Sequence, residues 1–187
     1  MLRVQSASGF NRRDINAGNK VLLPDEILHT LSNMYPVGLP YPMVFSVSSL
    51  KSRKTVYLGV LEFVAPQNQV VIPDWIYAQL QLNPSEMIRL GIVDQLPKAT
   101  FAQIRPQKTE FIELPDPKSV LEIQLRNFIC LTEGETISIR FANKEFLIDI
   151  VQLKPENQYK TGVIIDTDLV IDFATPLDYK EPEKKEV

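Results

Sequence analysis

Cysteine and histidine are almost missing from this sequence, which has one residue of each type in a chain of 187. A lone cysteine, Cys130, cannot form an internal disulfide or a thiolate-rich zinc site, and this scarcity fits a reducing compartment. Glycine is also scarce, and none of the seven glycines opens the G-x-x-x-x-G-K-[ST] or G-x-G-x-x-G pattern that cradles phosphates. We therefore expect neither an ATPase nor a dehydrogenase core, and no cofactor or metal.

Long apolar runs and, ahead of the C-terminal tail, blocks of basic residues are missing too. No window reaches the roughly 18 apolar residues of a membrane span, and residues 1–11 lack the apolar centre of a signal peptide. A formal net charge of −3 argues against nucleic acid or an anionic membrane as the main partner. Because 44% of the residues are hydrophobic, we expect one large or two small folded domains. The missing signal peptide and membrane span favour the cytoplasm or nucleus.

An internal repeat is the most informative pattern that is present. VLLPDEILHTL (residues 21–31) aligns without gaps with VVIPDWIYAQL (residues 70–80), 49 positions further on. Each copy predicts a short buried strand, then a helix with proline at its first position and aspartate in its first turn, where the helix dipole favours a carboxylate. Apolar segments at 41–47 and 87–93 complete two strand–helix–strand units with pseudo-twofold symmetry. The residues with structural roles are Pro24, Asp25, Pro73 and Asp74, followed by Trp75, which is expected to cap the barrel.

The repeat predicts a small closed barrel with short helices at its ends. Residues 56–64 supply another strand, and the alternating segment 98–106 is expected to cross back over the same core. The first unit is therefore predicted to span residues 1–106.

A second unit follows, and it opens with the strongest helix signal in the chain. Asp116 is a candidate N-cap, Pro117 occupies the first helical position, and apolar residues then recur at helical spacing as far as Phe128. We expect this helix to end at Cys130, a turn at residues 133–134, and strands at 135–141, 143–155 and 161–173. The sequence thus predicts an α/β unit over residues 107–179 and a charged, disordered tail over residues 180–187.

Two groups of side chains could carry chemistry. Cys130 and His29 form the one conceivable thiol–imidazole dyad, but a helix C-terminus raises a thiol pKa, and apolar neighbours favour Cys130 as a small core residue. Asp166, Asp168 and Asp172 share one face of the last predicted strand and could bind a divalent metal or act as acids and bases. The simpler interpretation is the acidic, solvent-facing side of a strand. We therefore expect a binding module and not an enzyme.

Five blocks of sequence resemble the signature blocks of a known family. In order, they are YPMVFSV, GVLEFVAP, IPDWIYAQL, PDPKSVLEIQLRNFICLTEGE and VIDFATPLDYKEP, and the match runs from about residue 10 to residue 182. The chain is similar to the amino-terminal domain of the ubiquitin fusion degradation protein family, the ubiquitin-recognising cofactor of the valosin-containing AAA ATPase. The resemblance implies a mainly β fold with α+β character: a double-psi β-barrel followed by a smaller α/β subdomain, with Cys130 in a structural helix and turn.

The resemblance also implies a function. Members of the family bind ubiquitin and ubiquitin chains and present tagged clients to the ATPase for unfolding before proteasomal degradation, including degradation associated with the endoplasmic reticulum. In the family, segments beyond this domain bind the ATPase and the nuclear protein localisation cofactor. This chain is expected to lack those segments. The implied location is the cytoplasm and nucleus, in part at the surface of the endoplasmic reticulum.

A ubiquitin surface offers a shallow apolar patch ringed by basic groups, so a complementary site needs exposed apolar side chains beside carboxylates. The candidate residues of this kind are Glu110, Phe111, Ile112, Glu113 and Tyr159. The competing interpretation packs Phe111 and Ile112 between the subdomains. Two other functions stay open: a module that binds the ATPase or another partner through the groove between subdomains, and an enzyme that uses Cys130 or the aspartates.

Overall fold

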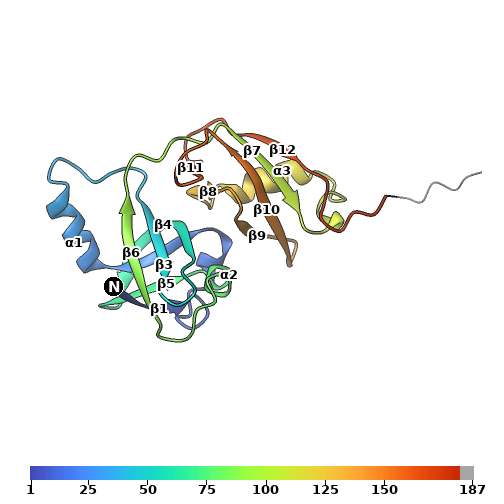
Figure 1. Cartoon of the computed structure of the whole chain (residues 1–187). Helices are drawn as coiled ribbons and strands as arrows, with labels where there is room; N and C mark the ends of the chain where they lie inside the picture. Colours follow the sequence, from blue (N-terminus) through green and yellow to red (C-terminus); the bar gives the residue numbers. More distant parts are fainter. Residues whose placement is uncertain (182–187) are drawn as a thin grey trace, which may run out of the picture.

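A computed structural model of the chain describes residues 1–181, which form two units (Figure 1). The first unit is a closed barrel in which the strands follow the order β1-β5-β2-β4-β3-β6. Its strands are β1 (Leu2–Ser6), β2 (Lys20–Pro24), β3 (Val44–Ser49), β4 (Thr55–Ala65), β5 (Gln69–Ile72) and β6 (Met87–Val93). The barrel also carries the helices α1 (Asp25–Met34) and α2 (Asp74–Gln79) and the 3₁₀ helix η1 (Arg13–Ala17).

The second unit contains a four-stranded sheet in the order β12-β7-β10-β9 and a separate pair, β11-β8. Its strands are β7 (Phe101–Pro106), β8 (Cys130–Thr132), β9 (Thr136–Phe141), β10 (Lys144–Lys154), β11 (Thr161–Val163) and β12 (Val170–Phe173). Its helices are η2 (Thr109–Phe111) and α3 (Pro117–Leu125). Because strands dominate both units, the fold is mainly β with α+β character, which confirms the predicted class.

The strand pairing of the barrel follows the sequence repeat. Leu22 of β2 pairs antiparallel with Val71 of β5, and these two residues occupy equivalent positions of the repeat. β1 runs parallel to β5 and β4 runs parallel to β2, while β3 and β6 pair antiparallel. If β1 is exchanged with β4, β2 with β5 and β3 with β6, every strand of the closed barrel still has the same two neighbours. The predicted pseudo-twofold relation of two strand–helix–strand units is therefore confirmed, while the double-psi crossing of the chain stays a prediction.

The repeated Pro-Asp pair starts each barrel helix, one position later than the sequence predicts. Pro24 and Pro73 are N-cap residues with ψ angles of 152° and 142°, and the helices begin at Asp25 and Asp74. The fixed φ of proline suits this junction between strand and helix, and the missing N–H of proline takes no hydrogen bond away from the helix. The aspartates lie in the first turn, as predicted.

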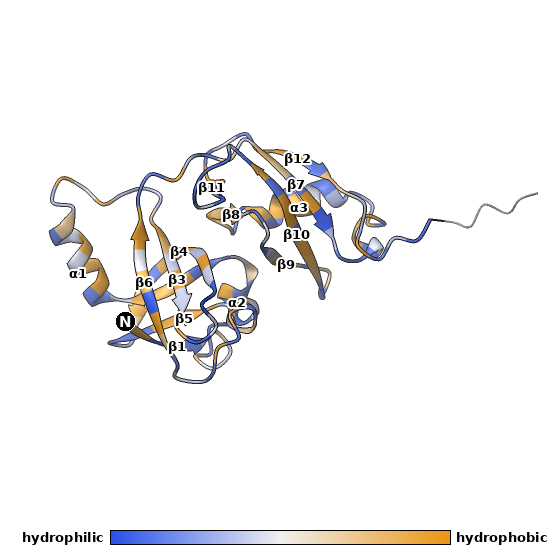
Figure 2. Ribbon diagram, viewed as in Figure 1, coloured by the Kyte–Doolittle hydropathy of each residue, from blue (hydrophilic) through white to orange (hydrophobic). Residues whose placement is uncertain are grey.

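Each unit has its own apolar core, and Figure 2 shows hydrophobic residues concentrated in the strands of both. The barrel core includes Val4, Leu23, Phe45, Leu58, Ile72 and Ile88. The core of the second unit includes Ile104, Phe111, Leu121, Ile137 and Ile148, so α3 and η2 both pack onto the four-stranded sheet. Trp75 packs against both cores.

The segment 98–106 does not cross back over the barrel, and that prediction is wrong. β7 instead lies between β10 and β12 in the second unit, where Ala102 and Ile104 are buried in the second core. Its alternation of apolar and polar residues is typical of any strand with one buried face. Such a pattern does not show against which of the two cores that face packs. A boundary after Pro106 stays a prediction, and the pairing of β7 favours a boundary before Phe101.

Two further elements differ from the sequence prediction. The helix α3 ends at Leu125, and Cys130 begins the strand β8 instead of ending the helix. Reverse-turn bonds, including Phe128 N–H to Leu125 O at 2.9 Å, end the helix early. The predicted strand 161–173 is interrupted between β11 and β12, so Asp166 and Asp168 lie in a connection while Asp172 lies in β12.

The three aspartates therefore do not share one strand face. Among residues 1–181, no group of three or more His, Cys, Asp or Glu side chains is arranged to hold a metal ion. Most of the predicted tail, residues 182–187, lies outside the described residues.

Candidate functional site: the cleft between the two units

A buried side-chain amide lies at the junction of the two units. The side chain of Asn19, which is fully buried, donates from Nδ2 to the carbonyl oxygen of Cys130 and accepts from the backbone N–H of Ile129, both at 2.9 Å. The amide thus pairs with the second unit much as a neighbouring strand would, and it satisfies two buried backbone groups that have high desolvation costs.

Two glycines allow this close contact. A Cβ atom on Gly18 would lie 2.1 Å from the carbonyl oxygen of Asn127, and one on Gly59 would lie 2.7 Å from the Cδ1 atom of Ile129. Both distances are far below van der Waals contact. At these two positions the backbone of the barrel therefore meets the second unit directly, with no side chain between them.

Trp75 completes the junction. Its indole Nε1–H donates to the carbonyl oxygen of Gly18 at 3.1 Å, and its ring centroid lies 6.1 Å from that of Phe128 in the second unit. Because the ring packs against both cores, the prediction that Trp75 caps the barrel alone is incomplete: it fills the space between the two units.

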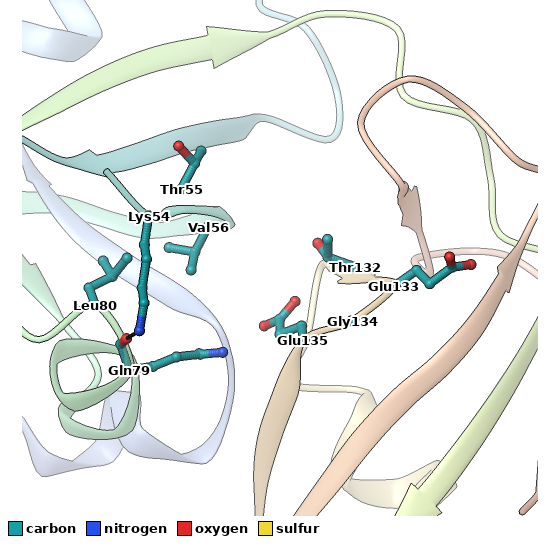
Figure 3. A pocket seen from close by; sticks show the side chains of 9 residues that line it. All are labelled: Lys54, Thr55, Val56, Gln79, Leu80, Thr132, Glu133, Gly134 and Glu135. Atoms are coloured by element: carbon teal, nitrogen blue, oxygen red, sulfur yellow. Dashed lines mark hydrogen bonds between the residues drawn. The ribbon is translucent and has the colours of Figure 1, made fainter. Parts of the chain in front are cut away.

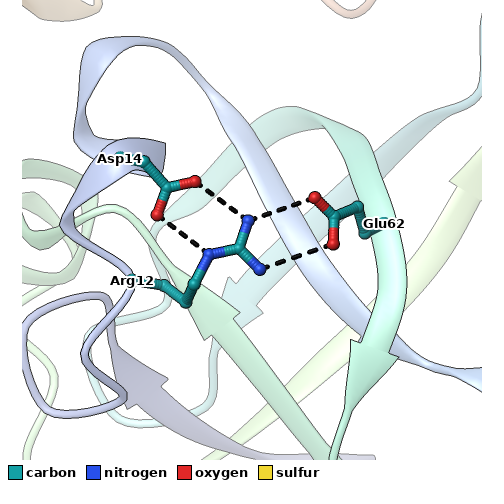
Figure 4. A network of polar contacts seen from close by, with 3 residues as sticks. All are labelled: Arg12, Asp14 and Glu62. Atoms are coloured by element: carbon teal, nitrogen blue, oxygen red, sulfur yellow. Dashed lines mark hydrogen bonds and ion pairs between the residues drawn. The ribbon is translucent and has the colours of Figure 1, made fainter.

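The segment that carries Gly18 and Asn19 is fixed to the barrel by an ion-pair network. The guanidinium group of Arg12 contacts Asp14 at 2.9 Å and Glu62 of β4 at 3.1 Å (Figure 4). Exposed pairs of this kind contribute little to stability, so the network mainly positions η1 against the barrel.

Asp74 ties the same segment to α2. Its carboxylate accepts hydrogen bonds from the backbone N–H of Ser8 at 2.9 Å and from Nδ2 of Asn16 at 2.8 Å. Burial opposes the ionisation of Asp74, but the hydrogen bonds from Ser8 and Asn16 outweigh it and keep the pKa of Asp74 below its ordinary value. This predicted helix-start aspartate is thus also an anchor for the N-terminal segment.

A cleft of about 360 Å³ lies between the units (Figure 3). The second unit contributes the turn of residues 132–135 between β8 and β9. The barrel contributes the start of β4 and the end of α2, with the lining residues Lys54, Thr55, Val56, Gln79 and Leu80. The buried side chains of Val56 and Leu80 give the cleft an apolar part, while its other lining is polar.

Glu135 is the most unusual group in this cleft. Its side chain points toward the barrel, whereas that of Glu133 points away and accepts from the backbone N–H of Leu153 at 3.1 Å (Figure 3). Glu135 is only 7% exposed, and its Oε1 atom accepts no hydrogen bond from any described residue. Burial raises the pKa of Glu135 to about 8, so this carboxyl group is largely protonated at neutral pH.

The opposite wall holds a second acceptor of the same kind. Oε1 of Gln79, at the end of α2, is buried and accepts no hydrogen bond from residues 1–181. Lys54 lies nearby, but its Nζ donates to the backbone oxygen of Gln79 at 3.3 Å, at the negative end of the helix dipole. Both Oε1 atoms are closed off from solvent, so neither is presented at the surface of the cleft.

The candidate ubiquitin-binding residues do not form one surface. Phe111 is fully buried in the second core, with its ring 5.3 Å from that of Phe146, so its assignment to an exposed patch is wrong. It packs within the second unit because η2 folds onto the sheet, and not between the units. Glu110 forms an ion pair with Lys144.

Four of these candidates keep some exposure, and Glu110 is one of them. Ile112 is 37% exposed, and the neighbouring Glu113 is also exposed. Tyr159 is half-buried and packs edge-on against Tyr57 of β4, with ring centroids 6.0 Å apart. Glu110, Ile112 and Glu113 stay candidates for a binding patch, as does Tyr159, which also belongs to the contact between units.

The thiol and the imidazole lie on separate elements. Cys130 is buried at the start of β8, where its Sγ donates to the carbonyl oxygen of Tyr57 at 3.4 Å. Burial, followed by the neighbouring Glu135, raises the pKa of the Cys130 thiol well above its usual value. His29 is exposed on α1. These two residues do not form a dyad in this structure.

The strands and the cleft define a mainly β domain of two units. Residues 1–97 match the family model described as Ubiquitin fusion degradation protein UFD1, N-terminal subdomain 1, and residues 98–176 match that of N-terminal subdomain 2. This chain belongs to the ubiquitin fusion degradation protein family.

Curated relatives cover nearly the whole chain. Ubiquitin fusion degradation protein 1 of Saccharomyces cerevisiae is 38% identical over 176 residues, which are 94% of this chain and 48% of that protein. Ubiquitin recognition factor in ER-associated degradation protein 1 of Homo sapiens is 35% identical over 175 residues, 94% of this chain and 55% of that protein. The chain thus spans about half the length of these relatives. Within residues 1–181, every helix is too short or too polar to span a bilayer.

Proposed function

We propose that this chain is a recognition domain that binds ubiquitin and ubiquitin chains without catalysing a reaction. The observation that carries the proposal is the alignment of 94% of the chain with a protein named as a ubiquitin recognition factor. The geometry supports it, because the two units are locked together by buried contacts and leave a preformed cleft between them. A rigid surface of this kind limits the entropy lost on binding.

In the cell, such a domain would recruit ubiquitinated clients to the valosin-containing AAA ATPase for unfolding and proteasomal degradation. The name of the human relative supports a role in ER-associated degradation. Family resemblance supports action in the cytoplasm and nucleus, and partnership with the ATPase and the nuclear protein localisation cofactor. Because the chain spans about half of its relatives, contacts with these two partners are proposals about the whole protein.

The test is a titration of the ¹⁵N-labelled chain with ubiquitin and with ubiquitin chains, followed by amide shifts. We expect saturable shifts that cluster on one face, with a Kd for single ubiquitin of about 10 μM to 1 mM, because a small patch binds weakly. Chains should bind more tightly if they engage two sites at once. A spectrum that does not change at millimolar ubiquitin would contradict the proposal.

Variants locate the patch. If ubiquitin docks on the exposed residues after η2, then Ile112→Ala should weaken binding several-fold, because an apolar contact at the patch is lost. Ile123→Ala on α3, where the side chain is 54% exposed, is the matched control and should bind like the parent chain. Equal affinity of both variants would move the patch elsewhere on the surface.

A second candidate function is favoured by the cleft itself: a module that binds the ATPase or another partner between the units. The lining of the cleft by both units supports it, because a concave, preformed surface can enclose part of a partner. The same titration separates the two functions, since a module specific for the ATPase would leave the spectrum unchanged by ubiquitin.

A further inference from the structure

One edge of the four-stranded sheet is open along β12. This strand is the last in the order β12-β7-β10-β9, and among residues 1–181 it pairs only with β7 (Figure 1). Every residue of β12 is at least partly exposed, whereas Ile137, Ser138 and Ile139 of β9, at the other edge of the sheet, are buried. A strand with an exposed, unpaired edge is a template for an added strand.

The hydrogen bonds of β12 show which of its backbone groups face outward. The N–H groups of Val170 and Ala174 donate to carbonyl oxygens on the side of β7, at 3.0 and 2.8 Å. Alternate residues of a strand bond to the same neighbour, so Ile171 and Phe173 turn their N–H and C=O groups toward the open edge. Neither residue pairs with a second strand within the described part of the chain.

A groove of about 540 Å³ lies beside this edge. Residues between Glu122 and Arg126 on α3 form one wall, and the segment 164–171, which includes the start of β12, forms the other. The half-buried side chains of Ile164, Leu169 and Ile171 pack against the second core and give the second wall an apolar surface. An added strand would direct the side chain opposite Ile171 to the same face, and thus into the groove.

The charges at the open edge select the kind of strand. The segment 164–173 carries three exposed aspartates and no basic residue, although Lys98 donates to one of its backbone oxygens at 2.8 Å. Glu122 and Arg126 on the facing wall offset each other, so the edge stays acidic. A second copy of the chain, paired edge to edge, would bring two acidic edges together, with Asp172 in each, and like charges oppose such pairing. A strand with basic side chains is attracted instead.

We propose that β12 accepts an extended segment of a partner polypeptide as an added antiparallel strand, with apolar side chains in the groove beside α3 and basic side chains against Asp172. The antiparallel direction is chosen because that pairing is the more stable one. Backbone hydrogen bonds to Ile171 and Phe173 give affinity, and the groove and the charges give specificity. The site goes beyond the recognition of ubiquitin, because it depends on one edge of the second unit alone.

The test titrates the ¹⁵N-labelled 187-residue chain with an acetylated, amidated peptide, Lys-Val-Lys-Val-Lys. In the proposed register its valines lie opposite Ile171 and Phe173, and its central lysine lies opposite Asp172. We expect saturable amide shifts over residues 164–173, with a Kd of about 0.1–1 mM for so short a peptide. The amide protons of Ile171 and Phe173 should move downfield because they gain hydrogen bonds, whereas that of Asp172 already faces β7. No ubiquitin is present, so this proposal and the proposed function can fail separately.

Modified peptides separate the contacts. N-methylation of both valines removes the N–H groups that face β12, and it should weaken binding by about tenfold or more. N-methylation of the central lysine alters an N–H that faces away from β12, so the Kd should stay within about twofold. Replacement of the three lysines by glutamates should weaken binding at least several-fold (roughly fivefold), because like charges then lie opposite each other.

Variants of the chain place the peptide on β12. Asp172→Asn keeps the shape of an exposed side chain but removes its charge, so it should weaken binding of the lysine peptide by about two- to fivefold. Asp25→Asn, at an exposed carboxylate of the barrel, is the matched control and should leave the Kd unchanged. Amide spectra outside residues 164–173 report that each variant is folded.

Several results would overturn the proposal. They are the absence of saturable shifts at several millimolar peptide, shifts that cluster away from residues 164–173, and equal binding of the valine-methylated or the glutamate peptide. A greater loss from lysine methylation than from valine methylation contradicts the antiparallel register, and equal affinity of Asp172→Asn and Asp25→Asn contradicts the contact with Asp172. If the amides of Ile171 and Phe173 shift with protein concentration in the absence of peptide, a second copy occupies the edge and the proposed occupant is wrong.

Discussion

At the scale of single residues, the fold takes a carboxyl group out of water and thereby links stability to pH. The pKa of Glu135 rises from 4.5 to about 8 because of burial. Between these values the unfolded chain has released a proton that the folded chain keeps, so stability falls as pH rises. This sign is opposite to that of Asp74, whose lowered pKa makes its stabilisation disappear only as pH falls below about 4.

Glu135→Gln should therefore remove a pH dependence. The amide keeps the size of the side chain but does not ionise, so the variant should gain stability over the parent chain by up to about 1.4 kcal/mol for each pH unit between pH 5 and pH 8. Urea unfolding at pH 5, 6.5 and 8 measures the difference, and Glu156→Gln is the exposed control. Parallel stability curves for Glu135→Gln and the parent chain would show that Glu135 does not titrate in this range.

Residues that act within a few positions of the chain could be predicted from the sequence. Asp116 accepts from the backbone N–H of Ser119 at 3.0 Å and caps α3, as its place before Pro117 indicates. Asn19 and Glu135 could not be found in this way, because their roles depend on groups more than 100 residues away or on a cleft formed by both units. Phe111 was misplaced for the same reason: local sequence does not show which sheet covers an aromatic ring.

At the scale of elements, two glycines decide how closely the second unit approaches the barrel. Gly18 faces the backbone of Asn127, which cannot rotate away, whereas Gly59 faces the side chain of Ile129, which has some freedom. Overpacking at a tight contact is destabilising because neighbouring atoms must shift. The backbone contact at Gly18 should be the less tolerant of the two.

Gly18→Ala should therefore destabilise the chain by about 1–3 kcal/mol and shift the resonances of residues 126–130. Gly91→Ala in β6 is the control, because its Cβ would meet only the hydroxyl oxygen of Ser46, at 3.1 Å. Denaturant unfolding and amide spectra measure both effects. If Gly18→Ala were no less stable than Gly91→Ala, the junction would be looser than the distances indicate.

The sequence predicts the position and the neighbours of those elements that belong to the internal repeat. It does not predict the neighbours of elements outside the repeat. The copies at 21–31 and 70–80 gave β2, α1, β5 and α2, because the repeat supplies both the local pattern and its symmetry mate. β7 has an equally clear alternation, but its partners β10 and β12 are 40 or more positions further on. The alternation of apolar and polar residues shows which face of a strand is buried, but it does not show which strands pair with it.

At the scale of the whole molecule, the cleft exists only while the two units stay together. One wall belongs to the barrel and the other to the second unit, so any change in their relation alters the distance between Gln79 and Glu135. The junction is apolar as well as polar: Val44 of the barrel shares a buried cluster with Ile129, Cys130 and Val163. A continuous buried junction of this kind favours unfolding of both units in one step.

The single tryptophan makes this cooperativity measurable. Urea unfolding followed by Trp75 fluorescence, which reports the junction, should coincide with unfolding followed by far-ultraviolet circular dichroism and by the methyl groups of Ile148 in the second core. Asn19→Ala leaves the N–H of Ile129 and the carbonyl of Cys130 without their partner, which should cost about 2–4 kcal/mol and separate the Ile148 transition from that of the barrel.

Asn33→Ala, at an exposed position of α1, is the matched control and should keep the transitions together. If the probes already separate in the parent chain, the two units fold independently and the cleft has no fixed width. If Asn19→Ala loses stability while its transitions still coincide, the apolar cluster and Trp75 are sufficient to couple the units. The buried amide then sets how the second unit is aligned on the barrel, because its paired hydrogen bonds are directional whereas apolar contact is not.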